Sequence, residues 1–382
     1  MRPIALVVFL ASAALAVIAL PQAPVLDKIT VGQLQQALAA ASGKTDAELA
    51  QQLSTFELTE RLSTTLLAQL NASAPGEKSR QALLLLADKS VFLDPPAVEI
   101  LADSTPDPAA TREMLVKIVN YVNTTLRQLP NLSAIRETMA FEDRPQEDAL
   151  EATGVVSYSY LPVHFVGKSS LAVTYRDRKE VVDERATKAL KHEGKIGGLV
   201  TSGEFGPILS MVLADALKGK ITWARWEHGS GGRLAVFHYT VPDEKSNYYV
   251  KFCCIVNGYS GTGQPESQLF DERASYHGEI AFDPANGSIL RITLQAEMPP
   301  KGLVSNAGIA MEYSSVEIGG RSYICPAKSV SVLMAHTAAQ QGMQSRTNYQ
   351  GAAKTFLNDI VYGQYRRFGS EARIVSVDSQ TP

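Results

Sequence analysis

The sequence predicts an α+β protein, in which a helical N-terminal region precedes a large curved antiparallel β-sheet, a half-barrel with one or two covering helices. Two observations support this fold class. Apolar residues recur at helical spacing up to about residue 129, and from about residue 133 they alternate with polar residues. Short turn signals separate the alternating runs, which is typical of an antiparallel meander with one dry face.

The composition is that of an ordinary globular protein. Hydrophobic residues make up 45% and charged residues 20% of the 382 positions, and the net charge is −3. The sequence has no long basic run interleaved with aromatic residues, so nucleic acid is not an expected partner.

The N-terminus, MRPIALVVFLASAALAVIALPQAP, carries one Arg before an apolar run over residues 4–20. This pattern is typical of a secretory signal peptide, which we assign to residues 1–23. An uncut membrane anchor is the alternative, because about 17 apolar residues lie at the short limit for a span. We expect a periplasmic or secreted protein with no transmembrane span after signal removal.

Residues 24–102 are predicted to form a region of short helices. Thr45 and Glu48 match a capping box, and Pro95 and Pro96 end the last helix. Residues 103–111, DSTPDPAAT, are the expected linker. Residues 112–382 then form the antiparallel β domain.

Two helices are predicted to cover the dry face of the sheet. The first spans 112–129 and has one apolar stripe, and Pro130 ends it. The second begins at Pro207, after SGEFG, in which Gly203 and Gly206 flank Phe205. The glycines allow this helix to act as a lid, but a permanent core helix is the interpretation that we favour.

The hairpin GEIAFDPANGSILRITLQAE, residues 278–297, shows the alternation most clearly. Ile280 and Phe282 share one side, as do Leu290, Ile292 and Leu294 on the other arm. By the same alternation Ile289 is expected on the solvated face of the sheet. Trp223 and Trp226 of an earlier strand are expected on opposite faces.

No catalytic, metal or cofactor site is predicted, and we expect a non-enzyme. The Gly258–Gly263 segment resembles a nucleophile elbow, but its last Gly is displaced and it leads into a turn-rich loop. His277 and Glu279 lie about 7 Å apart on one polar strand face. That spacing suits two metal ligands or an acid–base pair, but a solvated sheet face is the favoured interpretation.

Three cysteines, at 253, 254 and 325, allow one disulfide in an oxidising compartment. Neighbouring strand residues point to opposite faces, so only one of the adjacent pair can reach Cys325. We take Cys254 as the candidate partner. Three free, buried thiols are the alternative.

Several segments together resemble a group of uncharacterised exported proteins of soil bacteria. They are SGEFGPIL (202–209), GKITWARWE (219–227), the 278–292 hairpin, EYSSVEIGGRSYICPAKS (312–329) and YRRFGSEARI (365–374). The order G-x-I-x-F-D, G-x-I-x-R-I, Y-x-x-V-x-I-G-G-x-x-Y-x-x-P is also similar to that of outer-membrane lipoprotein-sorting proteins, the LolA-like fold. The resemblance covers roughly residues 110–378. It implies a curved sheet whose concave apolar face holds acyl chains.

Two functional hypotheses follow from the pattern and the resemblance. In the first, the protein binds a lipid or a lipoprotein acyl chain on the concave face of its sheet. The ligand-contacting residues would be Phe205, Leu209, Val212, Leu213, Ile280, Phe282, Leu290, Ile292 and Leu294. In the second, the core is filled, no ligand is bound, and the protein is a structural or protein-interaction module of the cell envelope, with an envelope protein as its partner.

Overall fold

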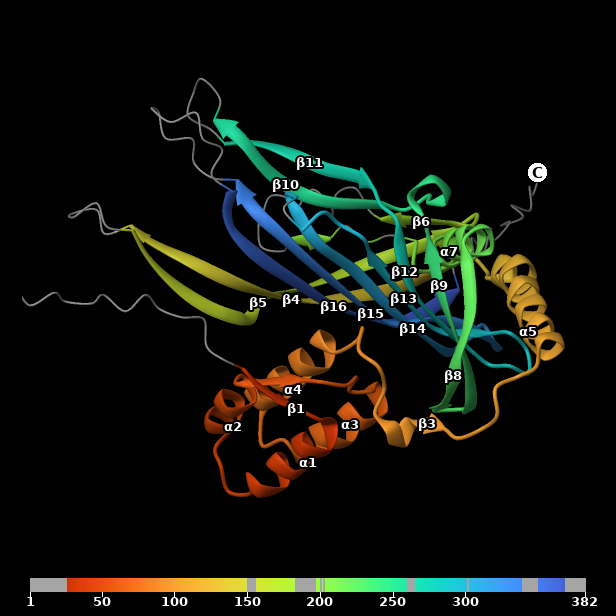
Figure 1. The fold of residues 1–382 in the computed structure, drawn as a ribbon, viewed down its shortest axis with the longest axis horizontal. Coiled ribbons are helices and arrows are strands. Elements are labelled where there is room, and N and C mark those ends of the chain that lie inside the picture. The colour runs from red at the N-terminus through yellow and green to blue at the C-terminus, as the bar shows by residue number, and fades with distance from the viewer. Residues whose placement is uncertain are drawn as a thin grey trace, which may run out of the picture.

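The structure is a computed structural model, and it describes residues 26–149, 156–182, 197–199, 201, 203–259, 265–300, 302–338 and 350–367. It confirms the predicted fold class, since a helical region precedes a large antiparallel sheet of eleven strands that does not close on itself (Figure 1). The strands, in sheet order, are β3 (Ile100–Leu101), β8 (Lys220–Gly229), β9 (Gly232–Val241), β12 (Tyr276–Phe282), β13 (Ile289–Ala296), β14 (Val304–Ile318), β15 (Arg321–Ala338), β16 (Gln350–Arg367), β4 (Leu132–Ala149), β5 (Val156–Arg176) and β6 (Lys179–Val182).

Most sheet neighbours are also neighbours in sequence, so the predicted meander is confirmed. The exceptions are β3 beside β8, β9 beside β12, and β16, the last strand in the order of the chain, beside β4. A second, smaller sheet has the order β11 (Pro265–Arg273), β10 (Tyr249–Tyr259) and β7 (Gly198–Leu199). Strand β11 was expected to be part of a turn-rich loop, because its sequence does not alternate.

The helical region has a hydrophobic core of its own. It contains α1 (Val31–Ala40), α2 (Asp46–Leu53), α3 (Thr64–Ser73), α4 (Glu77–Lys89), the 3₁₀ turn η1 (Ala97–Glu99) and the short parallel pair β1 (Asp27–Ile29) and β2 (Phe56–Leu58). The predicted capping box is confirmed, because Thr45 accepts from the Glu48 N–H and the Glu48 side chain accepts from the Thr45 N–H. Leu34, Leu53 and Leu83 are almost fully buried at the centre.

Helix α5 (Pro108–Asn120) begins inside the stretch expected to be a linker. The carboxylate of Asp107 accepts from the Ala110 N–H as an N-cap, and Pro108 occupies the first helical position. The linker is therefore shorter than residues 103–111. The helix continues through η2 (Tyr121–Thr125) and η3 (Leu126–Gln128), as the apolar stripe predicted.

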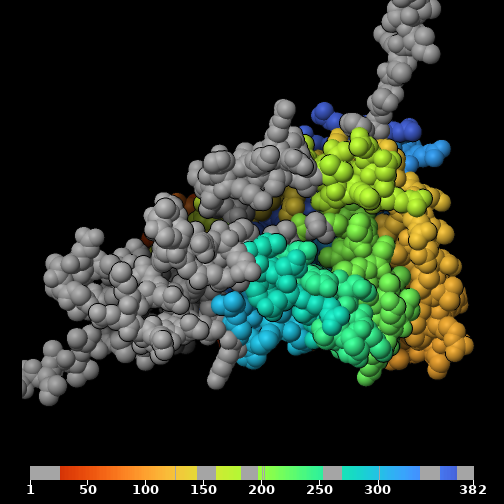
Figure 2. Space-filling model, turned by 90° about the horizontal axis from the view of Figure 1, so that it is seen from above, coloured from red at the N-terminus to blue at the C-terminus, as the bar shows by residue number. Residues whose placement is uncertain are grey.

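Helices α5 and α7 (Pro207–Lys218) cover one face of the large sheet, which we call the core face (Figures 1 and 2). The opposite face is called the outer face. One continuous apolar cluster fills the space between α5, α7, the small sheet and strands β9 to β15. Of the two interpretations of the second helix, the core helix fits this packing, because Leu209, Val212 and Leu213 are at most 4% exposed.

Two β-bulges correct the expected side-chain parity. Phe282 pairs with Ile289 rather than with Leu290, because the register shifts between Ala281 and Phe282. Leu290 therefore turns to the outer face and packs with the apolar cluster around Ala281, whereas Ile289 is fully buried on the core face.

A second register shift lies between Trp223 and Arg225 in β8. The rings of Trp223 and Trp226, which were expected on opposite faces, consequently meet edge to face with centroids 4.6 Å apart. Among the described residues, none of the helices is long and apolar enough to cross a membrane.

Candidate functional site at the junction of the helical region and the sheet

The helical region packs on the outer face of β8 and β12 to β15 (Figure 1). One close approach is made by Phe92, whose ring would lie 2.7 Å from a Cβ atom placed on Gly308 of β14. Glycine at this position therefore allows the aromatic ring to rest directly on the strand. Leu84, Leu85 and Val91 of the helical region also pack against an apolar cluster of the sheet, and charged side chains make further contacts across the junction.

The first charged cluster is centred on Glu227 of β8, which is 1% exposed. Its Oε2 atom lies 2.8 Å from Nη2 of Arg61 in the helical region and 2.9 Å from Nη1 of Arg291 on β13. A third guanidinium, that of Arg225, binds Glu227 Oε1 at 2.7 Å and makes a bidentate pair with Glu279 at 2.7 and 2.8 Å. Paired geometries of this kind give strong, directional charge-assisted hydrogen bonds.

The charges around Glu227 keep it ionised. Burial alone would raise the pKa of its carboxyl group, but the positive charges of Arg291 and Arg61 outweigh this effect and lower the pKa to about 2. Asp94 also lies 3.5 Å from Arg225 and Glu99 lies 3.8 Å from Arg61, so the three guanidinium groups are surrounded by four carboxyl groups.

The second charged cluster joins α4 to strands β15 and β16. Lys328 Nζ lies 2.6 Å from Asp88 Oδ1 and 2.8 Å from Asp359 Oδ2, and both carboxyl groups are almost fully buried. Burial raises the pKa of Asp88 well above its ordinary value, further than the positive charge of Lys328 lowers it. The pKa of Lys328 is raised by the two carboxyls although burial opposes this, so the lysine is charged at neutral pH.

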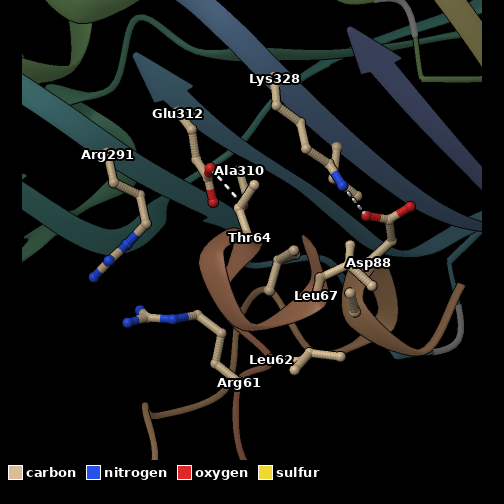
Figure 3. A pocket seen from close by; sticks show the side chains of 12 residues that line it. Arg61, Leu62, Thr64, Leu67, Asp88, Arg291, Ala310, Glu312 and Lys328 are labelled. Atoms are coloured by element: carbon tan, nitrogen blue, oxygen red, sulfur yellow. Dashed lines mark hydrogen bonds and ion pairs between the residues drawn. The ribbon is translucent and has the colours of Figure 1, made fainter. Parts of the chain in front are cut away.

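A small pocket lies between the two clusters and is lined by residues of both (Figure 3). Its volume of about 20 Å³ is enough for one water molecule. On its wall the Thr64 hydroxyl donates to Glu312 Oε2 at 2.6 Å (Figure 3). The centre of the junction is therefore filled and offers no space for a larger ligand.

A groove opens at the rim of the same junction. One cavity of about 640 Å³ lies between α1, α3, η1 and the β8–β9 turn, and a second of about 360 Å³ extends toward the β12–β13 turn and β14. The two are continuous, because both are lined by Ser63, Thr65, Glu99 and His228. We call the combined space the junction groove. Its walls combine apolar side chains, such as Val31 and Leu66, with hydroxyl, amide and carboxylate groups, and Val98 on the rim is 84% exposed.

The residues predicted to contact a hydrophobic ligand are mostly brought together, but as packed core. Seven of them are at most 4% exposed in the cluster beneath α5 and α7, namely Leu209, Val212, Leu213, Ile280, Phe282, Ile292 and Leu294. Phe205 is 1% exposed in an adjoining cluster, with its ring between Tyr175 and Tyr362. Leu290 is the exception and lies on the outer face.

His277 and Glu279, the candidate pair on the polar strand face, have different partners in the structure. Glu279 pairs with Arg225, whereas His277 pairs with Glu297 at the end of β13. Within the described ranges no group of three or more His, Cys, Asp or Glu side chains is placed to hold a metal ion.

Cys325 is buried, and burial raises the pKa of its thiol to about 12. The side chain of Cys254 lies outside the described part of the chain. The expected signal peptide and Ser260, the serine of the Gly258–Gly263 segment, also lie outside it. The pairing of Cys254 with Cys325 stays a prediction.

Sequence reasoning did not identify the residues of the junction. Arg61 and Asp88 lie in stretches that were treated only as helix and turn, and no local pattern relates them to partners more than 160 residues away. The sequence did contain one signal. Arg291 and Glu279 alternate with apolar residues in the 278–297 hairpin, so both were expected on the face opposite the core. Charged residues at such positions indicate either solvent or a buried partner.

Comparison with known proteins gives little guidance. No protein-family model matches the chain, and no curated protein does so. One solved structure is similar over 69% of this chain and all of its own, the MucA/MucB complex of Pseudomonas aeruginosa, at 9% identity and a TM-score of 0.17. That value is too low to relate the two folds.

Proposed function

We propose that this chain is an exported, non-catalytic interaction module of the cell envelope that engages a partner protein in the junction groove. The observation that carries the proposal is the contrast between the two faces of the sheet. The core face is filled by side chains of α5, α7 and the small sheet, whereas an open groove follows the junction on the outer face.

The filled core also argues against the acyl-chain carrier. A carrier would need an unfilled apolar space on the core face, where burial of each Å² of chain contributes about 25 cal/mol. Ile280, Ile292 and Leu294 instead pack against protein and are each 1% exposed. Releasing that packing to admit an acyl chain would remove as much apolar contact as the chain supplies.

The charged clusters give the groove fixed walls. Arg61 and Asp88 tie the helical region to the sheet at two separate points, so α1 and α3 cannot move freely relative to the β8–β9 turn. A rigid groove suits a protein partner, because little ordering is needed when the partner binds. The support for an envelope location is the N-terminal sequence pattern.

Site-specific photo-cross-linking tests the proposal. A benzophenone amino acid replaces Val98 on the groove rim or, as a matched control, Val116 on the exposed side of α5, which is 52% exposed. We expect a single cross-linked protein in the source organism at position 98 and none at 116. Thr65→Trp, which fills the groove from α3, should abolish the product, while Ala68→Trp, exposed on the same helix outside the groove lining, should leave it.

Three results would contradict the proposal. They are equal products at both positions, no product at position 98, and a product that Thr65→Trp leaves intact. If acyl chains are recovered from the purified protein in stoichiometric amount, the carrier hypothesis takes its place.

A further inference from the structure

Two carboxyl groups meet beneath the segment that leads into α7, on the core face. Glu204 is 1% exposed, and neither of its carboxyl oxygens has a hydrogen-bond partner within the described residues. Glu180 of β6 lies close enough to interact directly with Glu204 through its side chain, and its buried Oε1 atom has no described partner either. Unpaired acceptors of this kind are rare in native proteins and require an explanation.

One guanidinium group faces the two carboxyls. Arg136 of β4 interacts electrostatically with both Glu180 and Glu204, but its Nη2 atom is directed to the Thr201 hydroxyl at 2.9 Å. Ionisation of both carboxyls would therefore leave one negative charge uncompensated in a buried site. Burial makes such a charge costly unless the group takes up a proton.

The other titratable groups that face the pair, among the described residues, are tyrosine hydroxyls from β14 and β16. Burial raises the pKa of each, so all three are neutral at physiological pH; they are Tyr313, Tyr362 and Tyr365. Tyr175 of β5 pairs with Glu180 in the sheet register, and its pKa is also raised by burial. The charge of the site therefore depends on the two carboxyls and Arg136.

The same carboxyl pair holds a jointed segment of backbone. Glu180 Oε2 accepts the Gly203 N–H at 2.8 Å. Gly203 and Gly206 adopt φ values of +89° and +148°, in the region that favours glycine, so the chain turns sharply on each side of Phe205. Pro207 and the first turn of α7 follow directly. The protonation state of Glu180 therefore affects the hydrogen bond that fixes the segment between the sheet and α7.

We propose that Glu180 and Glu204 form a proton-operated latch, which holds the Gly203–Gly206 segment while the pair shares one proton and loosens it when that proton leaves to solvent. The expected motion is local. It involves the segment and the N-terminal end of α7, while the packed middle of the helix stays in the core.

The direction of the pH effect follows from the carboxyl of Glu180. Burial and then the neighbouring Glu204 raise its pKa from an ordinary 4.5 to about 7 in the closed state. A raised pKa stabilises the closed state fully below about pH 4.5, and this stabilisation is lost as the pH rises through 7. Opening of the segment should therefore increase with pH up to about 7 and then become constant.

Amide hydrogen exchange of the whole protein tests the latch. After correction for the intrinsic exchange rate, protection of amides 203–210 should fall by roughly 50-fold between pH 5.0 and pH 7.5, from the two pKa values and one proton. Strands β12 and β13 serve as an internal reference and should show no such change. Glu180→Gln should remain protected at both pH values, because its amide stays neutral and its oxygen can still accept the Gly203 N–H.

Two further variants make the test decisive. Glu204→Gln removes the second carboxyl but leaves Glu180 buried, so it should reduce the pH dependence without abolishing it, and it serves if Glu180→Gln does not fold. Glu137→Gln on the exposed side of β4, whose partner is Lys168 at 3.0 Å, should behave as the wild type. Equal protection of the wild type at the two pH values would overturn the inference, as would an undiminished pH dependence in both carboxyl variants.

Discussion

Glu227→Gln is the change that most directly tests how the helical region is held on the sheet. It keeps the shape of the side chain but removes the anion that Arg61, Arg225 and Arg291 share. The pKa of Glu227 is about 2, against an ordinary 4.5, and at about 1.4 kcal/mol for each pKa unit this difference corresponds to about 3 kcal/mol. Breaking a buried ion pair on one side costs roughly 3–5 kcal/mol, which agrees with this figure.

Urea denaturation measures the effect. The only two tryptophans, Trp223 and Trp226, lie in the same strand as Glu227, so their fluorescence reports the sheet next to the cluster. At pH 7 the variant should lose about 3 kcal/mol of unfolding free energy. Because the pKa of Glu227 is depressed, its contribution is present above about pH 4.5 and lost as the pH falls through 2. The difference between the two proteins should shrink over that range.

Glu137→Gln is the matched control, because its pair with Lys168 is about half exposed and should contribute less than about 1 kcal/mol. The reasoning would be refuted if Glu227→Gln cost no more than this control at pH 7. It would also be refuted if the difference between wild type and variant stayed constant down to pH 2.

Three further changes test the packing. Ile292→Ala should cost about 2–5 kcal/mol in urea unfolding as a buried core truncation, whereas Leu290→Ala on the partly exposed outer face should cost clearly less; equal costs would contradict the bulge in β13. Gly287→Ala should cost more than about 2 kcal/mol, because Gly287 has φ +79° and a Cβ atom would lie 2.4 Å from the Lys117 carbonyl oxygen; a neutral effect on the unfolding midpoint would argue against this contact with α5. Thr45→Ala should lower stability by about 1 kcal/mol through loss of the α2 cap, with Thr45→Ser retaining most of it; an unchanged midpoint for the alanine variant would argue against the cap.

The fold class could be predicted from sequence because its signals are local. Apolar alternation identified most strands of the large sheet, and cap and proline signals identified α2 and the end of the 112–129 helix. The two errors of side-chain parity share one physical cause. A bulge adds one residue to a strand and reverses the parity beyond it, so Leu290 was assigned to the wrong face and Trp223 and Trp226 were wrongly expected on opposite faces. Nothing in the local sequence marks where the extra residue is inserted.

The junction could not be predicted because its interactions are long-range. From the sequence, Lys328 is an ordinary polar residue of an alternating strand. Asp88 is likewise an ordinary solvent-facing residue of a helix. Only the fold brings them within 2.6 Å of each other and removes water from both. For the candidate ligand residues, the alternation correctly indicated an apolar face. Only the packing of the fold distinguishes a filled core from an open ligand-binding cavity on that face.

Native mass spectrometry of the protein purified from its source organism, followed by lipid extraction, tests the central claim that the core face is filled. The account predicts the mass of the polypeptide alone and no acyl chain in stoichiometric amount, because Ile280, Ile292 and Leu294 are already packed against α5, α7 and the small sheet. A bound lipid that dissociates only when the protein unfolds would contradict it and would favour the carrier.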